Sequence, residues 1–268
     1  MFLGNMPKDD GNLILSDDEK VSFIQKNTDS EKFIRKLMGA FEFLNGYQRW
    51  CIWIKDDFID EAKKIEDIKN RIEKVRDFRL ASTDDSANKM AETAHKFREQ
   101  HEAKRTSIII PTVTSERREY IPLGYLDKDV VIVAPNNVIY DPETYLFGVL
   151  SSRMHMTWMR TVAGRLKTDY RYSSALVYNT FPFPNISQKQ KDEIAELVFH
   201  ILDEREKHSQ KTLAQLYDPN KMPEGLRKAH QNLDFAIERC YRTKPFANDE
   251  ERLEYLFKMY EEMTKKGV

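Results

Sequence analysis

Residues 106–141 read TSIIIPTVTSERREYIPLGYLDKDVVIVAPNNVIYD. Short runs of β-branched and aromatic residues alternate here with Pro, Gly, Asp and Asn, which is typical of strands separated by turns. This stretch therefore predicts an antiparallel or mixed sheet from about residue 106 to residue 140. The segments on either side of it have mostly helical patterns.

The residues before the sheet predict helices around one buried strand. SDDE at 16–19 is a capping box, and SEKFIRKLMGAFEFLNG at 30–46 predicts a helix that stops at its Asn-Gly pair. RWCIWI at 49–54 is short, aromatic and β-branched, so it predicts the strand. Apolar residues at steps of three and four predict a long helix over 57–79, and a second helix runs to about residue 101.

The residues after the sheet predict one helix and two further strands. Helical spacing of apolar residues covers 143–163, and Gly164 is expected to end that helix. RLKTDYRY at 165–172 and ALVYNTF at 175–181 then predict a strand each. The FPFP at 181–184 is interpreted as a rigid hinge, because proline fixes φ and removes a backbone donor.

Beyond the hinge the chain is expected to be helical to its end, with helices opening at Ser187, near Pro223 and near the NDEE at 248–251. The predicted fold class is α+β, with a mixed or antiparallel sheet and flanking helices. We expect this first domain over residues 1–184, including a helical segment at about 57–101. A small all-helical C-terminal domain is expected over 185–268.

The charge of the chain is balanced overall but not along its length. The 268 residues carry 43 Lys and Arg and 44 Asp and Glu, which argues against a uniformly basic nucleic-acid-binding protein. Residues 104–186 carry 10 basic and 7 acidic groups, a local excess of positive charge. An anionic partner is therefore expected at the middle third.

The two cysteines, Cys51 and Cys240, lie far apart, and no Cys/His cluster has zinc spacing, so no metal site is expected. The N-terminus has no signal-peptide pattern, and no stretch approaches 18 consecutive apolar residues. We therefore expect a cytoplasmic protein without a membrane partner.

Catalytic motifs are missing from the sequence. It contains no GxGxxG, Walker, GxSxG or HExxH motif, and no Asp/Asn-Pro-Pro-aromatic motif of the kind that grips a flipped adenine. We therefore expect no catalytic residues and no cofactor in this segment.

The stretch 166–171 is the first candidate for reading DNA. If it is one strand, alternation places Lys167, Asp169 and Arg171 on the same face. Lys and Arg donate to guanine O6 and N7, and Asp accepts from cytosine N4, so this face could read adjacent base edges. The alternative interpretation is a surface strand with cross-strand ion pairs.

Basic and hydroxyl residues near this stretch are candidates for phosphate contacts, which position a protein on DNA without reading sequence. Three lie at an expected hairpin tip, TSERREY, which could equally be a solvated turn. His155 could touch a phosphate or serve only in packing. The full set is Ser115, Arg117, Arg118, Arg153, His155, Arg160 and Arg165.

Several long motifs resemble a known family. They are NGYQRWCIWI, IIIPTVTSERREYIPLGYLD, FGVLSSRMHMTWMRTVAGRLKTDYRYSSALVYNTFPFP and LAQLYDPNKMPEGLRKAHQNLDFAIERCYRTKPFANDEERLEYLF. Together they resemble the C-terminal part of MmeI-like DNA methyltransferases, from about residue 5 to the end of the chain.

The resemblance implies that catalysis and DNA recognition lie in different domains of the parent protein. In such adenine-specific enzymes a catalytic domain that binds S-adenosylmethionine comes first, and a target recognition domain and a helical C-terminal domain follow. This chain would be those last two parts, with duplex DNA and the catalytic domain of the same parent as partners. Sequence-reading residues of the family follow the GRL motif, which supports Lys167, Asp169 and Arg171 in that role.

Two other functions remain open from the residues alone. The chain could be a scaffold for protein partners that does not bind DNA, or a small intact enzyme with an unfamiliar site. Steep salt dependence of DNA binding would exclude the scaffold, since phosphate contacts release counterions.

Overall fold

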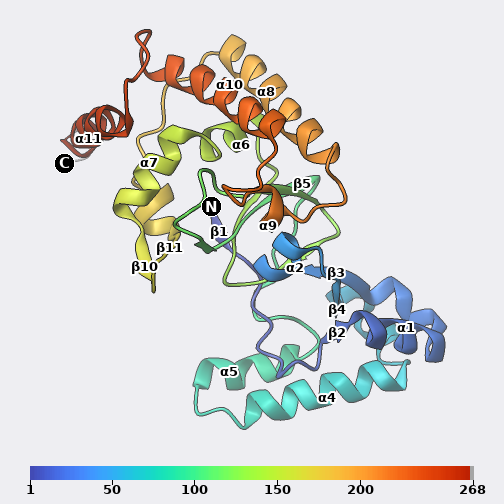
Figure 1. The fold of residues 1–268 in the computed structure, drawn as a ribbon. Helices are drawn as coiled ribbons and strands as arrows, with labels where there is room; N and C mark the ends of the chain where they lie inside the picture. Colours follow the sequence, from blue (N-terminus) through green and yellow to red (C-terminus); the bar gives the residue numbers. More distant parts are fainter. Residues whose placement is uncertain (266–268) are drawn as a thin grey trace. The chain divides into compact units, whose positions relative to one another are not determined.

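The structure is a computed structural model that describes residues 1–265 (Figure 1). It divides into two compact units. Unit 1 comprises Met1–Phe2, Ile108–Tyr125 and Asp141–Val268, and unit 2 comprises Leu3–Ser107 and Leu126–Tyr140. The C-terminal helices that follow residue 184 belong to unit 1 in this division.

Helices and strands are both present, so the α+β fold class is confirmed. The helices are α1 (Asp17–Lys26), α2 (Ala40–Asn45), α3 (Ile59–Ala62), α4 (Glu66–Leu80), α5 (Asp85–Lys89), α6 (Thr144–Leu150), α7 (Arg153–Val162), α8 (Gln188–Glu206), α9 (Leu213–Leu216), α10 (Glu224–Tyr241) and α11 (Asp249–Lys265). The strands are β1 (Phe2–Leu3), β2 (Ile14–Ser16), β3 (Ile34–Met38), β4 (Arg49–Ile52), β5 (Thr106–Ile110), β6 (Val113–Thr114), β7 (Gly124–Asp127), β8 (Val131–Ile132), β9 (Asn137–Tyr140), β10 (Gly164–Leu166) and β11 (Asp169–Arg171).

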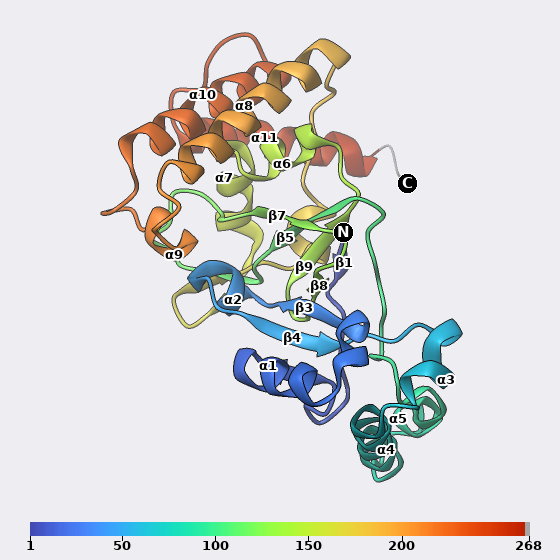
Figure 2. The same cartoon turned by 90° about the vertical axis from the view of Figure 1, so that its right-hand side faces the viewer.

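Unit 2 contains a four-stranded sheet in the order β2-β4-β3-β8. Strand β4 is antiparallel to β2 and to β3, whereas β3 and β8 are parallel, with Leu37 opposite Val131. Figure 2 shows α1 beside β4. The capping box of Ser16 and Glu19 at the start of α1 and the strand at 49–52 are confirmed.

The helix expected over residues 30–46 is wrong in its first half. Thr28–Phe33 is a 3₁₀ helix, and Ile34–Met38 is strand β3. Leu37 and Met38 are buried, and β3 is hydrogen-bonded on both sides. Pairing with β4 and β8 therefore overrides the local helical pattern. Only the short helix α2 remains, and Gly46 in the left-handed conformation ends it as expected.

The long helix expected over 57–79 is interrupted. Asp56–Phe58 is a 3₁₀ turn, and Ile65 is extended between α3 and α4. The second expected helix is also wrong, because only α5 and a 3₁₀ turn at Met90–Thr93 form before residue 101. Arg79 of α4 is 1% exposed and donates hydrogen bonds to backbone carbonyl oxygens around it.

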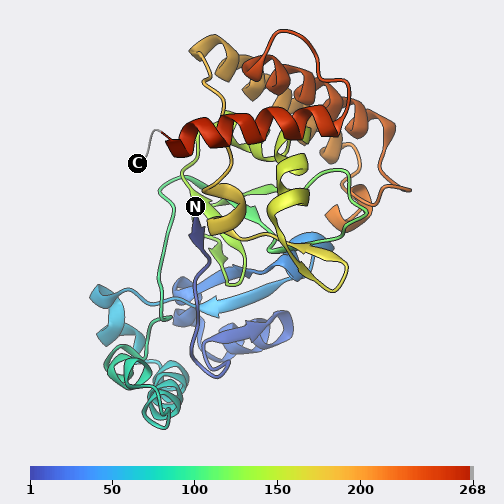
Figure 3. The same cartoon turned by 90° about the vertical axis from the view of Figure 1, so that its left-hand side faces the viewer.

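Unit 1 packs helices around a small sheet in the order β10-β11-β6. The helix expected over 143–163 is two helices, α6 and α7, since Ser151 and Ser152 separate them and Ser152 caps α7. Helix α6 approaches α8 closely at Gly148, where a Cβ atom would lie 2.5 Å from Cγ2 of Ile194. In Figure 3 the red helix α11 lies beside α7.

The strand expected for ALVYNTF is wrong, because Ser174–Tyr178 forms a π-helical turn. The expected helix starts after Pro184 are confirmed: Ser187 and Gln190 cap α8, α10 begins at Glu224 and α11 at Asp249. Helix α9 has its own capping box at Thr212 and was not predicted. None of the helices described in residues 1–265 combines the length and apolar character needed to cross a membrane.

Candidate nucleic-acid interface

The stretch expected to be one reading strand is a hairpin. Strands β10 and β11 pair antiparallel, with Arg165 opposite Tyr170 and Leu166 opposite Asp169. Lys167 and Thr168 form the two-residue turn between them, and Lys167 has a φ of +56°. Figure 1 shows the hairpin (yellow) beyond the end of α7. The turn was missed because it lacks the Asn-Gly or Asp-Gly pair that usually marks a hairpin.

The hairpin changes which side chains share a face. Residues directly opposite each other in an antiparallel pair point to the same side, so Asp169 and Arg171 lie together as expected, but Leu166 lies with them. Lys167 lies at the exposed tip rather than on that face. The structure thus brings the three predicted reading residues to one hairpin, although the strand alternation used to group them is wrong.

Besides the exposed Arg165, this region has three exposed cations, which are Arg117, Lys167 and Arg171. Within the described residues their side chains form no hydrogen bond or ion pair. Exposed, unpaired cations on a short sheet can donate to phosphate or base-edge oxygens. Ser115 is half-buried, and its Oγ accepts from the backbone N of Arg117 at 3.4 Å.

Arg118 and Arg160 hold the segment that follows β6. The Arg118 guanidinium lies 3.4 Å from Thr114 Oγ1, and burial lowers its pKa. Arg160 Nη2 donates to the carbonyl oxygen of Arg118 at 3.0 Å. Both side chains are only partly exposed, so part of each guanidinium is used within the protein.

His155 is not available to a phosphate in this structure. Its side chain is 0% exposed, and Nε2 lies 2.9 Å from Tyr172 Oη. The ring packs edge-on against Phe181, and burial lowers the pKa of His155 to about 3. The phosphate-contact hypothesis for His155 is wrong in this conformation, and packing is its role.

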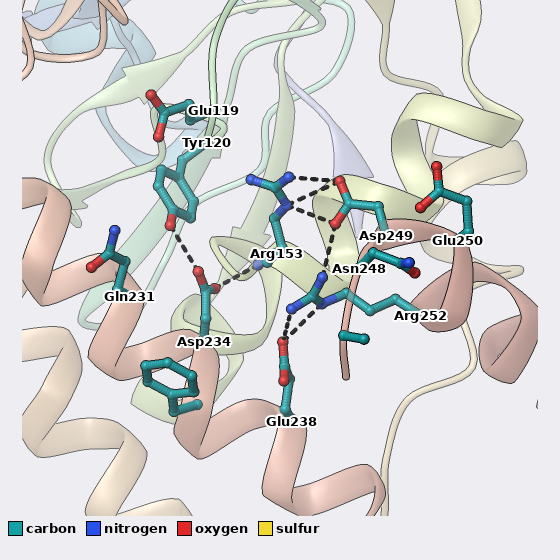
Figure 4. A pocket seen from close by; sticks show the side chains of 12 residues that line it. Glu119, Tyr120, Arg153, Gln231, Asp234, Glu238, Asn248, Asp249, Glu250 and Arg252 are labelled. Carbon is teal, nitrogen blue, oxygen red and sulfur yellow. Dashed lines mark hydrogen bonds and ion pairs between the residues drawn. The ribbon is translucent and has the colours of Figure 1, made fainter. Parts of the chain in front are cut away.

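Arg153 is likewise engaged inside unit 1. Its Nε and Nη2 atoms donate to the carboxylate of Asp249, at 2.9 and 2.7 Å (Figure 4). Asp249 also accepts from Arg252, whose guanidinium is bound by the buried Glu238. Arg153 therefore links α7 to α11 and is not a free cation, contrary to its expected phosphate contact.

These residues line a pocket of about 690 Å³ between α7, α10 and α11 (Figure 4). Asp234 accepts hydrogen bonds there from Tyr120 Oη at 2.7 Å and from the backbone N of Arg153 at 2.6 Å. The carboxylate lies at the N-terminus of α7, where negative charge is favoured. Burial nevertheless raises the pKa of Asp234 to about 7, and the neighbouring Glu238 acts in the same direction.

The raised pKa makes stability depend on pH with a defined sign. A carboxyl whose folded-state pKa is raised stabilises the fold below its unfolded pKa, and that contribution is lost as pH rises through about 7. Asp234→Asn keeps an acceptor for Arg153 N but cannot ionise. Relative to this variant, the wild type should lose about 4 kcal/mol of stability between pH 4 and pH 8, since a shift of one pKa unit corresponds to about 1.4 kcal/mol. Thermal unfolding of both proteins across that range measures the difference, and parallel profiles would contradict it.

Sequence reasoning missed Glu116 and the role of Arg165. Arg165 Nη1 donates to the carbonyl oxygen of Thr168 at 2.7 Å and lies 3.4 Å from Glu116 Oε2. Its guanidinium carbon lies 3.9 Å from the centre of the Tyr170 ring. Only the hairpin register, which sequence alternation could not supply, places these groups together. Among residues 1–265 no cluster of three or more His, Cys, Asp or Glu side chains could hold a metal ion.

The chain is similar to known proteins over almost its whole length. The family model for the MmeI target recognition domain matches residues 1–185, and the model for the MmeI C-terminal domain matches residues 186–267. DNA methyltransferase A of Bacillus subtilis (strain 168) is 47% identical over 266 residues, which are 99% of this chain and 30% of that protein.

A solved structure is similar over nearly the whole chain. The type IIL restriction-modification enzyme MmeI in complex with DNA matches with a TM-score of 0.93 and 41% identity, over 98% of this chain and 35% of that one. The chain thus spans about a third of the length of either relative. It belongs to the MmeI family, of which it carries the target recognition domain and the C-terminal domain.

Proposed function

We propose that this chain is the sequence-specific duplex-DNA recognition segment of a longer, cytoplasmic, adenine-N6-specific DNA methyltransferase of a restriction-modification system. The observation that carries the proposal is the exposed hairpin of Lys167, Asp169 and Arg171 beside Arg117, within a chain that matches the MmeI target recognition domain. The similar solved structure, MmeI in complex with DNA, supports duplex DNA as the partner.

The hairpin residues suit base edges in the major groove. Lys167 and Arg171 can donate to guanine O6 and N7, and Asp169 can accept from cytosine N4. A two-stranded ribbon fits the width of that groove. Arg117, Arg118 and Ser115 lie on the segment after β6, which pairs with β11, and are the remaining candidates for phosphate contacts.

Methyl transfer requires chemistry that these residues do not supply. The sequence has no glycine-rich cofactor loop and no Asp/Asn-Pro-Pro-aromatic motif. Nor do the residues around the hairpin or in the pocket of Figure 4 fit S-adenosylmethionine, since ion pairs within the protein occupy the charged groups of that pocket. We therefore propose that another part of the longer protein binds S-adenosylmethionine and carries out catalysis on a flipped adenine.

Salt dependence tests the proposed function directly. The full-length protein should bind a 30-bp duplex that carries its methylated motif, which sequencing of DNA modified by the wild type identifies. With Arg117 and Arg118 on phosphates, these two cations should lower affinity about tenfold between 50 and 200 mM salt. A duplex without the motif is the control and should bind more weakly at every salt concentration. Absent or salt-insensitive binding would instead support a scaffold for protein partners.

A further inference from the structure

The tip of the hairpin is strained and needs support. Lys167 has a φ of +56°, a conformation that costs a residue with a side chain about 1 kcal/mol or more relative to glycine. Such a conformation persists only where the surrounding structure holds it. Two proposed reading residues, Lys167 and Asp169, flank Thr168, so the geometry of this turn decides where their side chains point.

Arg165 supports the turn from inside the hairpin. Its Nη1 donates to the carbonyl oxygen of Thr168 at 2.7 Å, and its guanidinium stacks on the ring of Tyr170. Tyr170 is 7% exposed and pairs with Thr114 of β6, so the platform under the guanidinium is fixed to the sheet.

Glu116 extends this support to Asp169. Its carboxylate lies 3.4 Å from Arg165 Nη1, and its backbone N lies 3.3 Å from Asp169 Oδ1. Arg165 and Tyr170 lie on the face opposite to Asp169 and Arg171. Arg165 is therefore directed at the hairpin itself and away from the proposed reading face.

We propose that Arg165, assisted by Glu116, is a positioning residue for sequence discrimination and not a phosphate anchor. The inference rests on the proposed function, because it assumes that the hairpin reads DNA. Arg165 holds the Thr168 carbonyl and thereby aims Lys167 and Asp169. A positioning residue alters the preference between sequences, whereas a phosphate anchor alters affinity for all sequences equally and contributes to the salt dependence.

The test uses the full-length protein with Arg165→Ala and Arg165→Lys, and Arg117→Ala as the matched exposed control. Fluorescence anisotropy measures binding to the duplex with the methylated motif and to duplexes with one base pair of that motif changed, at several salt concentrations. Arg165→Ala should reduce discrimination between these duplexes about tenfold, with an unchanged slope of log affinity against log salt. Arg117→Ala should weaken binding to all duplexes and reduce that slope by about one.

Arg165→Lys separates the two roles further. Lysine keeps the charge but lacks the planar fork that both stacks on Tyr170 and reaches the Thr168 carbonyl. Discrimination should therefore be as poor in Arg165→Lys as in Arg165→Ala. The positioning role is overturned if lysine restores wild-type behaviour, or if Arg165→Ala lowers the salt slope and leaves discrimination intact. If the wild type itself does not discriminate, the proposed function fails, and this inference fails with it.

Discussion

Arg79→Ala should destabilise unit 2 by about 3–5 kcal/mol, because it removes a buried cation that satisfies five carbonyl groups. The guanidinium donates to the carbonyl oxygens of Pro7, Lys8, Met90, Thr93 and Lys96, at 2.6–3.2 Å. These five bonds use all five N–H donors of arginine. Burial lowers the pKa of Arg79. No other side chain has the planar arrangement of five N–H donors that could replace the guanidinium.

Hydrogen exchange of the full-length protein measures this effect. Amides in residues 7–13 and 90–96 should lose protection in Arg79→Ala, and peptides of unit 1 serve as the internal reference. Arg79→Lys should recover part of the loss, since an ammonium supplies three of the five donors. Arg76→Ala is the control, because Arg76 is exposed on the same helix and should change stability by less than about 0.5 kcal/mol. Equal effects of Arg79→Ala and Arg76→Ala would contradict a stabilising role for the five hydrogen bonds from Arg79 to carbonyl oxygens.

Alanine substitution of Lys167, Asp169 or Arg171 should change the DNA sequence that the full-length protein methylates. Asp169→Ala removes the acceptor proposed for cytosine N4, so discrimination at one base pair should fall by about 10- to 100-fold. Lys167→Ala and Arg171→Ala should each relax a position in the same way, since each removes a proposed guanine donor. Sequencing of the modified DNA reports the motif, and methylation rates on duplexes with single changes give the size of each effect.

The effect of each substitution on different DNA sequences distinguishes a base-reading residue from a phosphate anchor. A reader affects one position of the motif, whereas Arg117→Ala should lower methylation of all sequences by a similar factor. If Asp169→Ala leaves the motif unchanged, the hairpin does not read DNA through that carboxylate. If Arg171→Ala weakens all sequences equally, Arg171 is a phosphate anchor.

Features set by a few neighbouring residues could be predicted from the sequence. The capping boxes at Ser16 and Ser187 depend on a residue three positions on, and the start of α10 depends on Pro223. The stop at Gly46 needs only a residue that tolerates the left-handed conformation. In each case the physical cause lies within one helical turn, so the local pattern is sufficient.

Features set by distant partners could not be predicted. Ile34–Met38 has helical spacing but pairs with β8, almost a hundred residues away. His155 and Arg153 lie in the basic middle segment, and only packing shows that Tyr172 and Asp249 engage them. The hairpin at Lys167 was missed for a further reason, since its turn has none of the usual residues and depends on Arg165.

The two units are interleaved along the chain, and this limits the positions at which recombination between related genes can exchange one unit intact. Unit 1 is made of three segments of the chain and unit 2 of two, so the chain passes between them four times. A recombination breakpoint near residue 107 would separate β3 from β8, whose parallel pairing would then join strands of different origin. A breakpoint just after Tyr140 moves both segments of unit 2 together, but it carries β6 with them. In such a hybrid, β6 of one parent must pair with β11 of the other. The residues at positions 113–114 must therefore be compatible with those at positions 170–171.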